Sequence, residues 1–331
     1  MSVSTPTDAG LMARAIELGQ SVRQIAPPNP WVGAVLVAAD GSCFEGATEA
    51  PGGRHAEIVA LEAAGDAAQG ATLVVTLEPC AHHGRTGPCT DAIITAGVRR
   101  VLLGVQDPDE MVSGRGIDRL EAAGIVVERD LLADAVGDSL AAYLHHRRTG
   151  RPLVLLKLAA TLDGRTAAPD ATSKWITGPE ARADVARLRS ESDAIMVGAG
   201  TVRADDPALT ARAEPAPHRQ PLRVVLGAIP EGARVLPARS MSGEPISILD
   251  ELGAEGVLQV LIEGGAGVAH EFVAADLVDR FVVYLAPAIM GGDDGAPMFR
   301  GPGAATIDAM RRGRFVSVTR LGEDLRLEVA A

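Results

Sequence analysis

The sequence is poor in aromatic residues, in cysteine and in positive charge. Only 3% of its 331 residues are aromatic, so its cores must be built mainly from Ala, Val, Leu and Ile. Three cysteines in a chain of this length exclude a framework of disulfide bonds. Lys and Arg number 31 against 43 Asp and Glu, and the resulting net charge of −12 argues against general affinity for nucleic acid.

Long apolar runs are missing too. The longest are far shorter than the roughly 20 residues that a membrane span requires, and residues 1–10 lack the basic and apolar segments of a signal peptide. We therefore expect a soluble, cytoplasmic protein. The 331 residues, of which 47% are hydrophobic, are enough for two domains of ordinary size.

The first half alternates between extended and helical patterns after a hairpin signal at Asp40-Gly41. The expected strands are 32–38, 43–47, 73–77, 98–105 and 125–128, and the expected helices are 11–24, 55–64, 91–96, 116–123 and 131–148. This order predicts an α/β/α sandwich. Residues 145–152 are basic and end in Gly and Pro, so we place a domain boundary between 148 and 149.

The second half, 149–331, predicts another α/β domain. Its expected strands are 153–160, 193–197, 222–226, 257–262 and 277–285, with a final hairpin of 315–321 and 325–329. Helices are expected at 179–191 and 268–274, and loops at 211–221 and 227–245, which are rich in Pro, Ala and Gly.

The clearest chemical signal is a histidine and two cysteines with a glutamate nearby. Cys80 follows a predicted buried strand, Cys89 comes nine positions later, and His55 opens a predicted helix. A catalytic zinc site uses three such ligands and keeps one position for water. Glu57 would take the proton from that water and deliver it to the substrate. The pattern therefore predicts a zinc deaminase site.

Other interpretations of these residues stay open on the pattern alone. His-Ala-Glu can be a helix start with a solvated Glu, and the cysteines can be unrelated buried thiols. In zinc deaminases two residues usually separate the cysteines, whereas eight do here. Either His82 or His83, which lie in that interval, could compete as a metal ligand.

Two glycine-rich turns follow predicted strands of the second half, at 198–201 and 264–267. A strand, glycines and then a helix place backbone N–H groups and a helix dipole against a phosphate. Each turn alone can be an ordinary tight connection, but two in one domain suggest a dinucleotide that lies across the sheet.

Residues 78–89, Glu-Pro-Cys-Ala-His-His-Gly-Arg-Thr-Gly-Pro-Cys, resemble the bifunctional deaminase–reductases of riboflavin biosynthesis, in which a long loop separates the two cysteines. Residues 28–33 and 55–57 resemble the same family, and 157–165, 173–177 and 200–210 resemble its reductase domain. The resemblance thus covers nearly the whole chain. It implies a cytidine-deaminase-like first domain, and a second domain that is similar in fold to dihydrofolate reductase and uses NADPH.

For the first domain, the resemblance implies hydrolytic deamination of 2,5-diamino-6-ribosylamino-4(3H)-pyrimidinone 5′-phosphate at its 2-amino group. Zinc would be held by His55, Cys80 and Cys89, and Glu57 would move protons. The implied substrate-binding residues are Asn29, His82, Arg85, Asp107 and Asp109. Asp109 stands where the family usually has asparagine, so it replaces a hydrogen-bond donor by an acceptor.

For the second domain, it implies hydride transfer from NADPH to C1′ of the ribosyl chain, which opens to ribityl. The implied substrate-binding residues are Lys157, Ser173, Arg189, Leu209, Arg212 and Glu263, with the arginines meeting the phosphate. The implied NADPH-binding residues are Ala160, Asp163, Trp175, Thr201, Asp205, Gly265, Ala266, Gly267 and Val268. Lys157 and Asp163 would also assist proton movement.

Three other functions are to be weighed against this one. The second domain could bind a substrate without turning it over, the first could deaminate bases in nucleic acid, or the zinc could be purely structural. We expect a small phosphorylated substrate as the partner, neither nucleic acid nor a membrane. The resemblance also implies a homodimer or a larger homo-oligomer.

Overall fold

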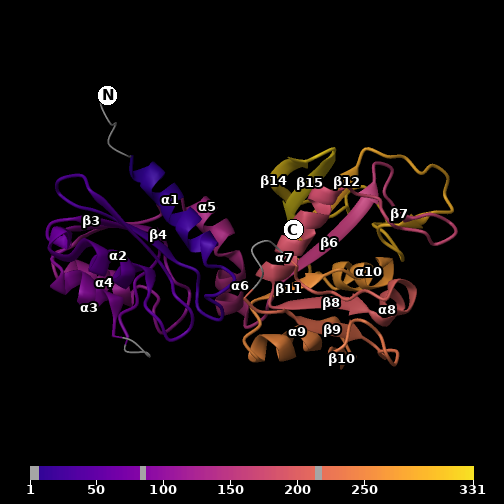
Figure 1. Cartoon of the computed structure of the whole chain (residues 1–331), viewed down its shortest axis with the longest axis horizontal. Coiled ribbons are helices and arrows are strands. Elements are labelled where there is room, and N and C mark those ends of the chain that lie inside the picture. The colour runs from indigo at the N-terminus through magenta and orange to yellow at the C-terminus, as the bar shows by residue number, and fades with distance from the viewer. Residues whose placement is uncertain (1–6, 83–86, 213–217) are drawn as a thin grey trace. The chain divides into compact units, whose positions relative to one another are not determined.

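The structure is a computed structural model that describes residues 7–82, 87–212 and 218–331 (Figure 1). The chain divides into two compact units, Met1–Thr149 and Gly150–Ala331. Within the described ranges, none of the helices combines the length and the apolar character that a membrane crossing needs.

The first unit is built on a mixed sheet with strand order β2-β1-β3-β4-β5. Its strands are β1 (Gly33–Val37), β2 (Cys43–Ala47), β3 (Thr72–Leu77), β4 (Arg100–Val105) and β5 (Val126–Glu128). Strand β1 runs antiparallel to β2 and β3, whereas β3, β4 and β5 are parallel. The strands lie where the sequence predicts them, to within a residue or two.

Helices cover both faces of this sheet (Figure 1). One face carries α1 (Asp8–Ser21) and α5 (Ala133–Ser139), and the other carries α2 (Ala56–Ala64), α3 (Cys89–Thr95) and α4 (Arg115–Ala122). A 3₁₀ turn, Gly65–Ala68, follows α2. Fully buried apolar side chains such as Met12, Leu73 and Ile117 fill the space between the layers. The predicted α/β/α sandwich is therefore confirmed.

Glycine brings the first turn of α2 close to the sheet. A Cβ atom at Gly46 of β2 would lie 2.1 Å from the carbonyl oxygen of Ala56 and 2.7 Å from the amide nitrogen of Ala60. Both contacts are with backbone, which cannot move aside as a flexible side chain can. Gly46 therefore sets how closely α2, which begins directly after His55, packs on β2.

We expect Gly46→Ala to lower the free energy of unfolding of the first unit by about 1–3 kcal/mol, the usual cost of overpacking a close-packed interior. Denaturant unfolding followed by circular dichroism measures this. The matched control is Gly137→Ala, because a Cβ atom at Gly137 would meet nothing within 4 Å. A loss no larger at Gly46 than at Gly137 would contradict close packing as the cause.

The prediction of one continuous helix at 131–148 is wrong in one respect, because the structure has two helices there, α5 and α6 (Ala141–Thr149). The carbonyl oxygen of Ser139 accepts hydrogen bonds from Trp31 Nε1 at 2.9 Å and from Gln20 Nε2 at 3.1 Å. These side chains use the acceptor that would continue the helix, and Leu140 leaves the helical conformation with ψ near 12°. Tertiary contacts from distant residues thus interrupt a helical sequence.

The second unit contains a sheet with strand order β10-β9-β8-β11-β6-β12-β15-β14. Its strands are β6 (Leu153–Thr161), β8 (Ala194–Gly198), β9 (Leu222–Leu226), β10 (Arg239–Met241), β11 (Gln259–Ile262), β12 (Arg280–Ala286), β14 (Arg314–Leu321) and β15 (Asp324–Ala330). Pairing from β10 to β12 is parallel, and β15 and β14 add antiparallel strands. The carboxyl ends of the parallel strands therefore meet at one edge, where open α/β sheets bind ligands.

The helices of this unit are α7 (Pro179–Glu191), α8 (Ala199–Asp205), α9 (Pro245–Ala254) and α10 (Ala266–Ala274). Strand β10 lies in the segment 227–245 that was expected to be a loop, and that expectation is wrong there. Helix α9 was missed, although Pro245 in its first turn and the buried Ile248, Leu249 and Leu252 have helical spacing. A small sheet of β7 (Arg165–Ala167) and β13 (Ala296–Pro297) was missed as well.

Candidate active sites

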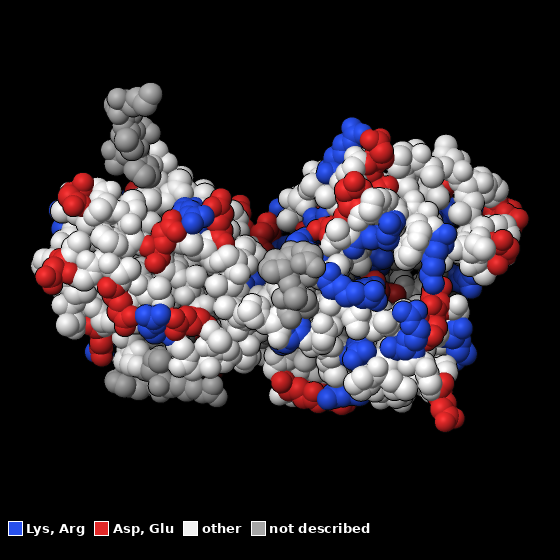
Figure 2. Space-filling model, viewed as in Figure 1, with Lys and Arg blue, Asp and Glu red and all other residues white. Residues whose placement is uncertain are grey.

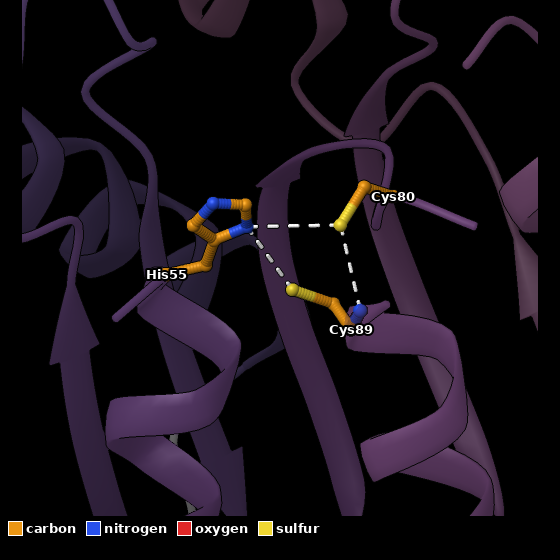
Figure 3. A group of neighbouring side chains, drawn as sticks. All are labelled: His55, Cys80 and Cys89. Carbon is orange, nitrogen blue, oxygen red and sulfur yellow. Dashed lines mark hydrogen bonds between the residues drawn. The ribbon is translucent and has the colours of Figure 1, made fainter. Parts of the chain in front are cut away.

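In the first unit, His55, Cys80 and Cys89 come together from three separate segments (Figure 3). His55 precedes the first turn of α2, Cys80 lies just beyond β3, and Cys89 is the first residue of α3. The Nδ1 atom of His55 is 3.2 Å from Cys89 Sγ and 3.7 Å from Cys80 Sγ. The backbone N–H of Cys89 donates to Cys80 Sγ at 3.4 Å. The three ligand atoms all lie within 4.8 Å of one another.

The two sulfur atoms differ in their electrostatics. A hydrogen bond from Cys89 and another from His55 lower the pKa of the Cys80 thiol well below its usual range. The same contact with Cys80, together with burial, raises the pKa of Cys89 above its usual range. A metal ion binds thiolates and would replace the proton that the pair shares.

One imidazole nitrogen and two sulfurs at this separation fit zinc, which takes such ligands in tetrahedral sites. A catalytic zinc site has three protein ligands, so the fourth position is left for water. Within the described part of the chain, His82 does not belong to this group, and its Nδ1 atom is buried without a hydrogen-bond partner. His83 lies outside the described residues. The histidine that joins the two cysteines is therefore His55.

Glu57 lies in the first turn of α2 with only 4% of its surface exposed. Burial, and then the negative charge of Cys80, raise the pKa of Glu57 to about 7, while a hydrogen bond with Cys89 opposes the shift. Its carboxyl group therefore interacts with Cys89 through a hydrogen bond and with Cys80 through charge. A carboxyl with such a pKa can both accept and release a proton near neutral pH.

The residues expected around this centre are placed unequally. Asn29 is half-buried in the turn after α1, where its backbone N–H donates to Ala26. His82 is half-buried in the loop that follows Cys80. Arg85, for which phosphate binding was predicted, lies outside the described residues.

Asp107 and Asp109 are used within the protein. Asp107 is 4% exposed, and its carboxylate accepts hydrogen bonds from Tyr143 Oη at 3.0 Å and from the backbone N–H of Asp109 at 2.9 Å. Asp109 caps the backbone N–H of Met111 at 3.0 Å and lies 3.5 Å from Arg147 Nε. Asp107 therefore shapes this loop through both of its oxygens.

The second unit carries a cleft of about 1370 Å³ at the carboxyl ends of its parallel strands. Figure 2 shows Lys and Arg side chains gathered around a hollowed part of this unit. The predicted residues that line the cleft are Lys157, Ser173, Trp175, Arg189, Thr201, Asp205, Leu209, Arg212, Glu263, Gly265, Ala266, Gly267 and Val268. Residues up to 111 positions apart in sequence are thus brought to one site, from Lys157 to Val268.

Three charged residues form the polar centre of this cleft. Arg189 of α7 binds Glu263 with two nitrogens, at 2.5 Å from Nε and 2.9 Å from Nη2. Lys157 of β6 lies 3.8 Å from Glu263 Oε2. Burial lowers the pKa of Lys157, with Glu263 opposing the shift. Glu263, at the end of β11, therefore holds both cations.

The two glycine turns lie next to each other in the sheet, because β8 and β11 are paired. Gly198 precedes α8, and Gly265 precedes α10. The hydroxyl of Thr201 accepts the backbone N–H of Gly265 at 3.1 Å and so joins the two turns. Two helix N-termini with free N–H groups suit the phosphates of a dinucleotide.

Ala160 and Asp163 do not line the cleft in the described structure. Ala160 is fully buried. Asp163 accepts hydrogen bonds from Thr161 Oγ1 at 2.6 Å and from the backbone N–H groups of Met290 and Gly291. These bonds, that of Thr161 first, lower its pKa to about 2. Asp163 therefore fixes the neighbouring loop, and its binding of NADPH stays a prediction.

Two residues that sequence reasoning missed have clear roles in the structure. The guanidinium of Arg182 stacks on the ring of Trp175 at 4.7 Å, so that the exposed Trp175 has one face covered. The separation of Trp175 and Arg182 in the sequence does not predict this contact. In the first unit, the buried Glu78 accepts hydrogen bonds from four backbone N–H groups. In the sequence, only its position directly before Pro79-Cys80 pointed to a role for Glu78.

Comparison with known proteins agrees with this geometry in both units. Residues 5–105 match the cytidine and deoxycytidylate deaminase zinc-binding region, and residues 152–327 match the RibD C-terminal domain. The chain is 45% identical over 332 residues to the riboflavin biosynthesis protein RibD of Mycobacterium tuberculosis strain H37Rv, with 97% of this chain and 96% of that protein covered.

Solved structures resemble it along the same length. Acinetobacter baumannii RibD, form 1, is 36% identical with a TM-score of 0.88, and 98% of each chain is covered. A Thermotoga maritima protein, described as a diaminohydroxyphosphoribosylaminopyrimidine deaminase/5-amino-6-(5-phosphoribosylamino)uracil reductase, is 34% identical with a TM-score of 0.88 and the same coverage. The chain therefore belongs to the RibD family of riboflavin biosynthesis, in which a zinc-binding deaminase domain is joined to a reductase domain that uses NADPH.

Proposed function

We propose that residues 1–148 deaminate 2,5-diamino-6-ribosylamino-4(3H)-pyrimidinone 5′-phosphate and that residues 149–331 then reduce its ribosyl chain. The final product is 5-amino-6-ribitylaminouracil 5′-phosphate. The observation that carries the first step is the cluster of His55, Cys80 and Cys89, with Glu57 interacting with both cysteines. The Thermotoga neighbour, whose description names both activities, supports the pairing of the two steps.

In the first step, water adds to the ring carbon that carries the 2-amino group, and ammonia leaves. Zinc, when bound, lowers the pKa of a water molecule to around 7 and so supplies a nucleophile at neutral pH. Glu57 takes a proton from the water and returns it to the leaving nitrogen, which its burial and its interactions with Cys80 and Cys89 support. The new carbon–oxygen bond replaces the carbon–nitrogen bond, and no oxidant is needed.

The residues that would bind the substrate of the first unit are assigned from their positions in the chain and the fold. Asn29 and His82 are half-buried polar side chains in loops, and His82 Nδ1 is buried without a partner in the described chain. We assign these two and Arg85 to substrate binding. Asp107 and Asp109 fix the shape of their own loop, because their carboxylates accept hydrogen bonds from Tyr143 and from backbone N–H groups.

Replacing Cys89 by serine should remove zinc and deamination together while reduction continues. A serine hydroxyl is not deprotonated at neutral pH and is a much poorer zinc ligand than a thiolate. Metal analysis should find far less than one zinc per chain. The control is Cys43→Ser, because Cys43 is exposed and lies outside the metal group. Zinc retained in full by the Cys89 variant would contradict the assigned ligands.

In the second step, NADPH, when bound in the cleft, would supply a hydride to C1′ of the ribosyl chain. The C1′–O4′ bond breaks, its electron pair goes to the oxygen, and a proton completes the ribityl hydroxyl. Lys157 is our candidate for the proton donor, because it lines the cleft with a lowered pKa and is positioned by Glu263. Glu263 in turn is fixed by two hydrogen bonds from Arg189.

We assign one group of cleft residues to NADPH and another to the substrate. The turns around Thr201 and Gly265 would hold the pyrophosphate of NADPH, and Trp175 would stack on a ring of the cofactor. Ser173 and Arg212 are proposed for the substrate phosphate. Arg212 is the freer cation, because Arg189 already gives Nε and Nη2 to Glu263.

A steady-state assay of NADPH oxidation on the deaminated intermediate tests the second step. Oxidation in proportion to ribityl product supports a reductase, whereas none with folded protein would leave a domain that only binds. Deamination of nucleic acid is a weaker candidate, since the net charge is −12. A homo-oligomer and a cytoplasmic location stay predictions.

A further inference from the structure

The carboxylate of Glu78 is buried beside the zinc-binding motif and is surrounded by backbone N–H groups. Glu78 is 4% exposed. Its Oε1 atom accepts from Gly116 at 2.9 Å and from Ile117 at 3.3 Å, and its Oε2 atom accepts from Gly114 at 3.1 Å and from Asp107 at 3.3 Å. One side chain thus binds four amides from a single stretch, 107–117.

This stretch joins the end of β4 to the start of α4. Gly114 precedes the helix, and Gly116 and Ile117 lie in its first turn. The backbone here rests directly on the motif, because a Cβ atom at Gly116 would lie 2.0 Å from the carbonyl oxygen of Pro79. Glu78 therefore ties the residues that follow β4 to the segment that presents Cys80.

The charge of Glu78 is balanced without a cation in the described part of the chain. Its partners are backbone N–H groups and the positive end of the α4 dipole, both of which favour a carboxylate. An ion pair would tolerate some movement of a flexible side chain, whereas four amides define the position of the backbone itself. The arrangement therefore fixes geometry as well as charge.

Asp107 makes further hydrogen bonds that hold the same stretch. Its carboxylate accepts from Tyr143 of α6 and from the N–H of Asp109, while its own N–H donates to Glu78. The segment that begins at Asp107 is thus positioned by two buried carboxylates. One of them, Glu78, is two residues from the zinc ligand Cys80.

We infer that Glu78 is a positioning residue for deamination, which holds the 107–117 segment, with the predicted substrate-binding residues Asp107 and Asp109, against the segment that presents Cys80. The inference rests on the proposed deaminase function. Glu78 acts through the backbone it holds and takes no part in the chemical step.

The Glu78→Gln variant tests this. The amide puts an NH₂ group where one oxygen accepts two N–H groups, so half of the acceptor capacity is lost with little change in size. We expect KM for deamination to rise about 10- to 100-fold, the equivalent of one hydrogen bond to a charged group. The value of kcat should change less, zinc should stay at one per chain, and reduction of the deaminated intermediate should be unchanged. Amide hydrogen exchange in 107–117 should become faster.

Two further variants sharpen the result. Glu128→Gln makes the same substitution on the surface of this unit, where Glu128 pairs with Arg100, and should leave KM unchanged. Glu78→Asp keeps the charge but shortens its reach, and should give a smaller rise in KM. It serves as the test variant if the Gln variant does not fold.

Other outcomes would overturn the inference. An unchanged KM would mean that the substrate does not sense the position of this segment. A loss of zinc, or an equal fall in deamination and reduction, would mean that Glu78 only supports the fold. If the wild-type protein does not deaminate the substrate, the proposed function fails first; unchanged hydrogen exchange in the variant would then separately refute Glu78 as the residue that holds 107–117.

Discussion

The Glu57→Gln variant should lose deamination by about 10²–10⁴-fold, the usual contribution of a general acid–base group. Glutamine has the same shape but cannot take a proton from water. The fold should tolerate the change, because burial already raises the pKa of Glu57 to about 7 and so disfavours its charged form. Metal analysis should still find one zinc per chain, since Glu57 is not a member of the metal group.

Two comparisons make this result specific. Glu62→Gln places the same substitution further along α2, on an exposed side chain that pairs with Arg54, and should leave deamination unchanged. NADPH oxidation on the deaminated intermediate should be equal in both variants. If Glu57→Gln keeps both its zinc and its deaminase activity, the zinc is structural and the assignment of Glu57 is refuted.

The Lys157→Met variant should lose reduction by about 10²–10⁴-fold while deamination continues. Methionine fills a similar volume without a proton to give. Removing the ammonium also leaves Arg189 as the partner of Glu263, so the ion pair beside it should survive. The measurement is single-turnover oxidation of NADPH with the deaminated intermediate present.

Lys157→Arg separates charge from proton transfer. Arginine keeps the positive charge next to Glu263, but its pKa is far higher than that of lysine, which makes it a poor proton donor. We expect this variant to be nearly as slow as Lys157→Met. Full activity in the arginine variant would show that the cleft needs a cation here and no proton from Lys157.

The sequence predicted the chemistry of the first unit best, because its motif residues lie in short segments whose ends are easily recognised. His55 and Glu57 open a helix, Cys80 follows a buried strand, and Cys89 begins the next helix. Glu78 was missed because its four partners are backbone amides 29 to 39 residues away, which no side-chain pattern reveals.

Tertiary contacts explain the other differences. The helix at 131–148 is interrupted where Trp31 and Gln20 take the carbonyl of Ser139, a contact that spans more than 100 residues. Asp163 and Asp107, for which ligand binding was predicted, also hold loops in the fold, a role that their sequence positions did not indicate. Strand β10 is only three residues long, Arg239–Met241, and gains its structure from pairing with β9.

Product identification on the diaminopyrimidinone phosphate, with metal analysis of the same sample, tests the central claim most directly. With zinc bound and NADPH absent, mass spectrometry should find the deaminated ribosylaminouracil phosphate and one ammonia per turnover. With NADPH added, the ribitylaminouracil phosphate should replace it, with one NADPH oxidised for each product formed. Zinc-loaded, folded protein that leaves the 2-amino group in place under both conditions would contradict the account.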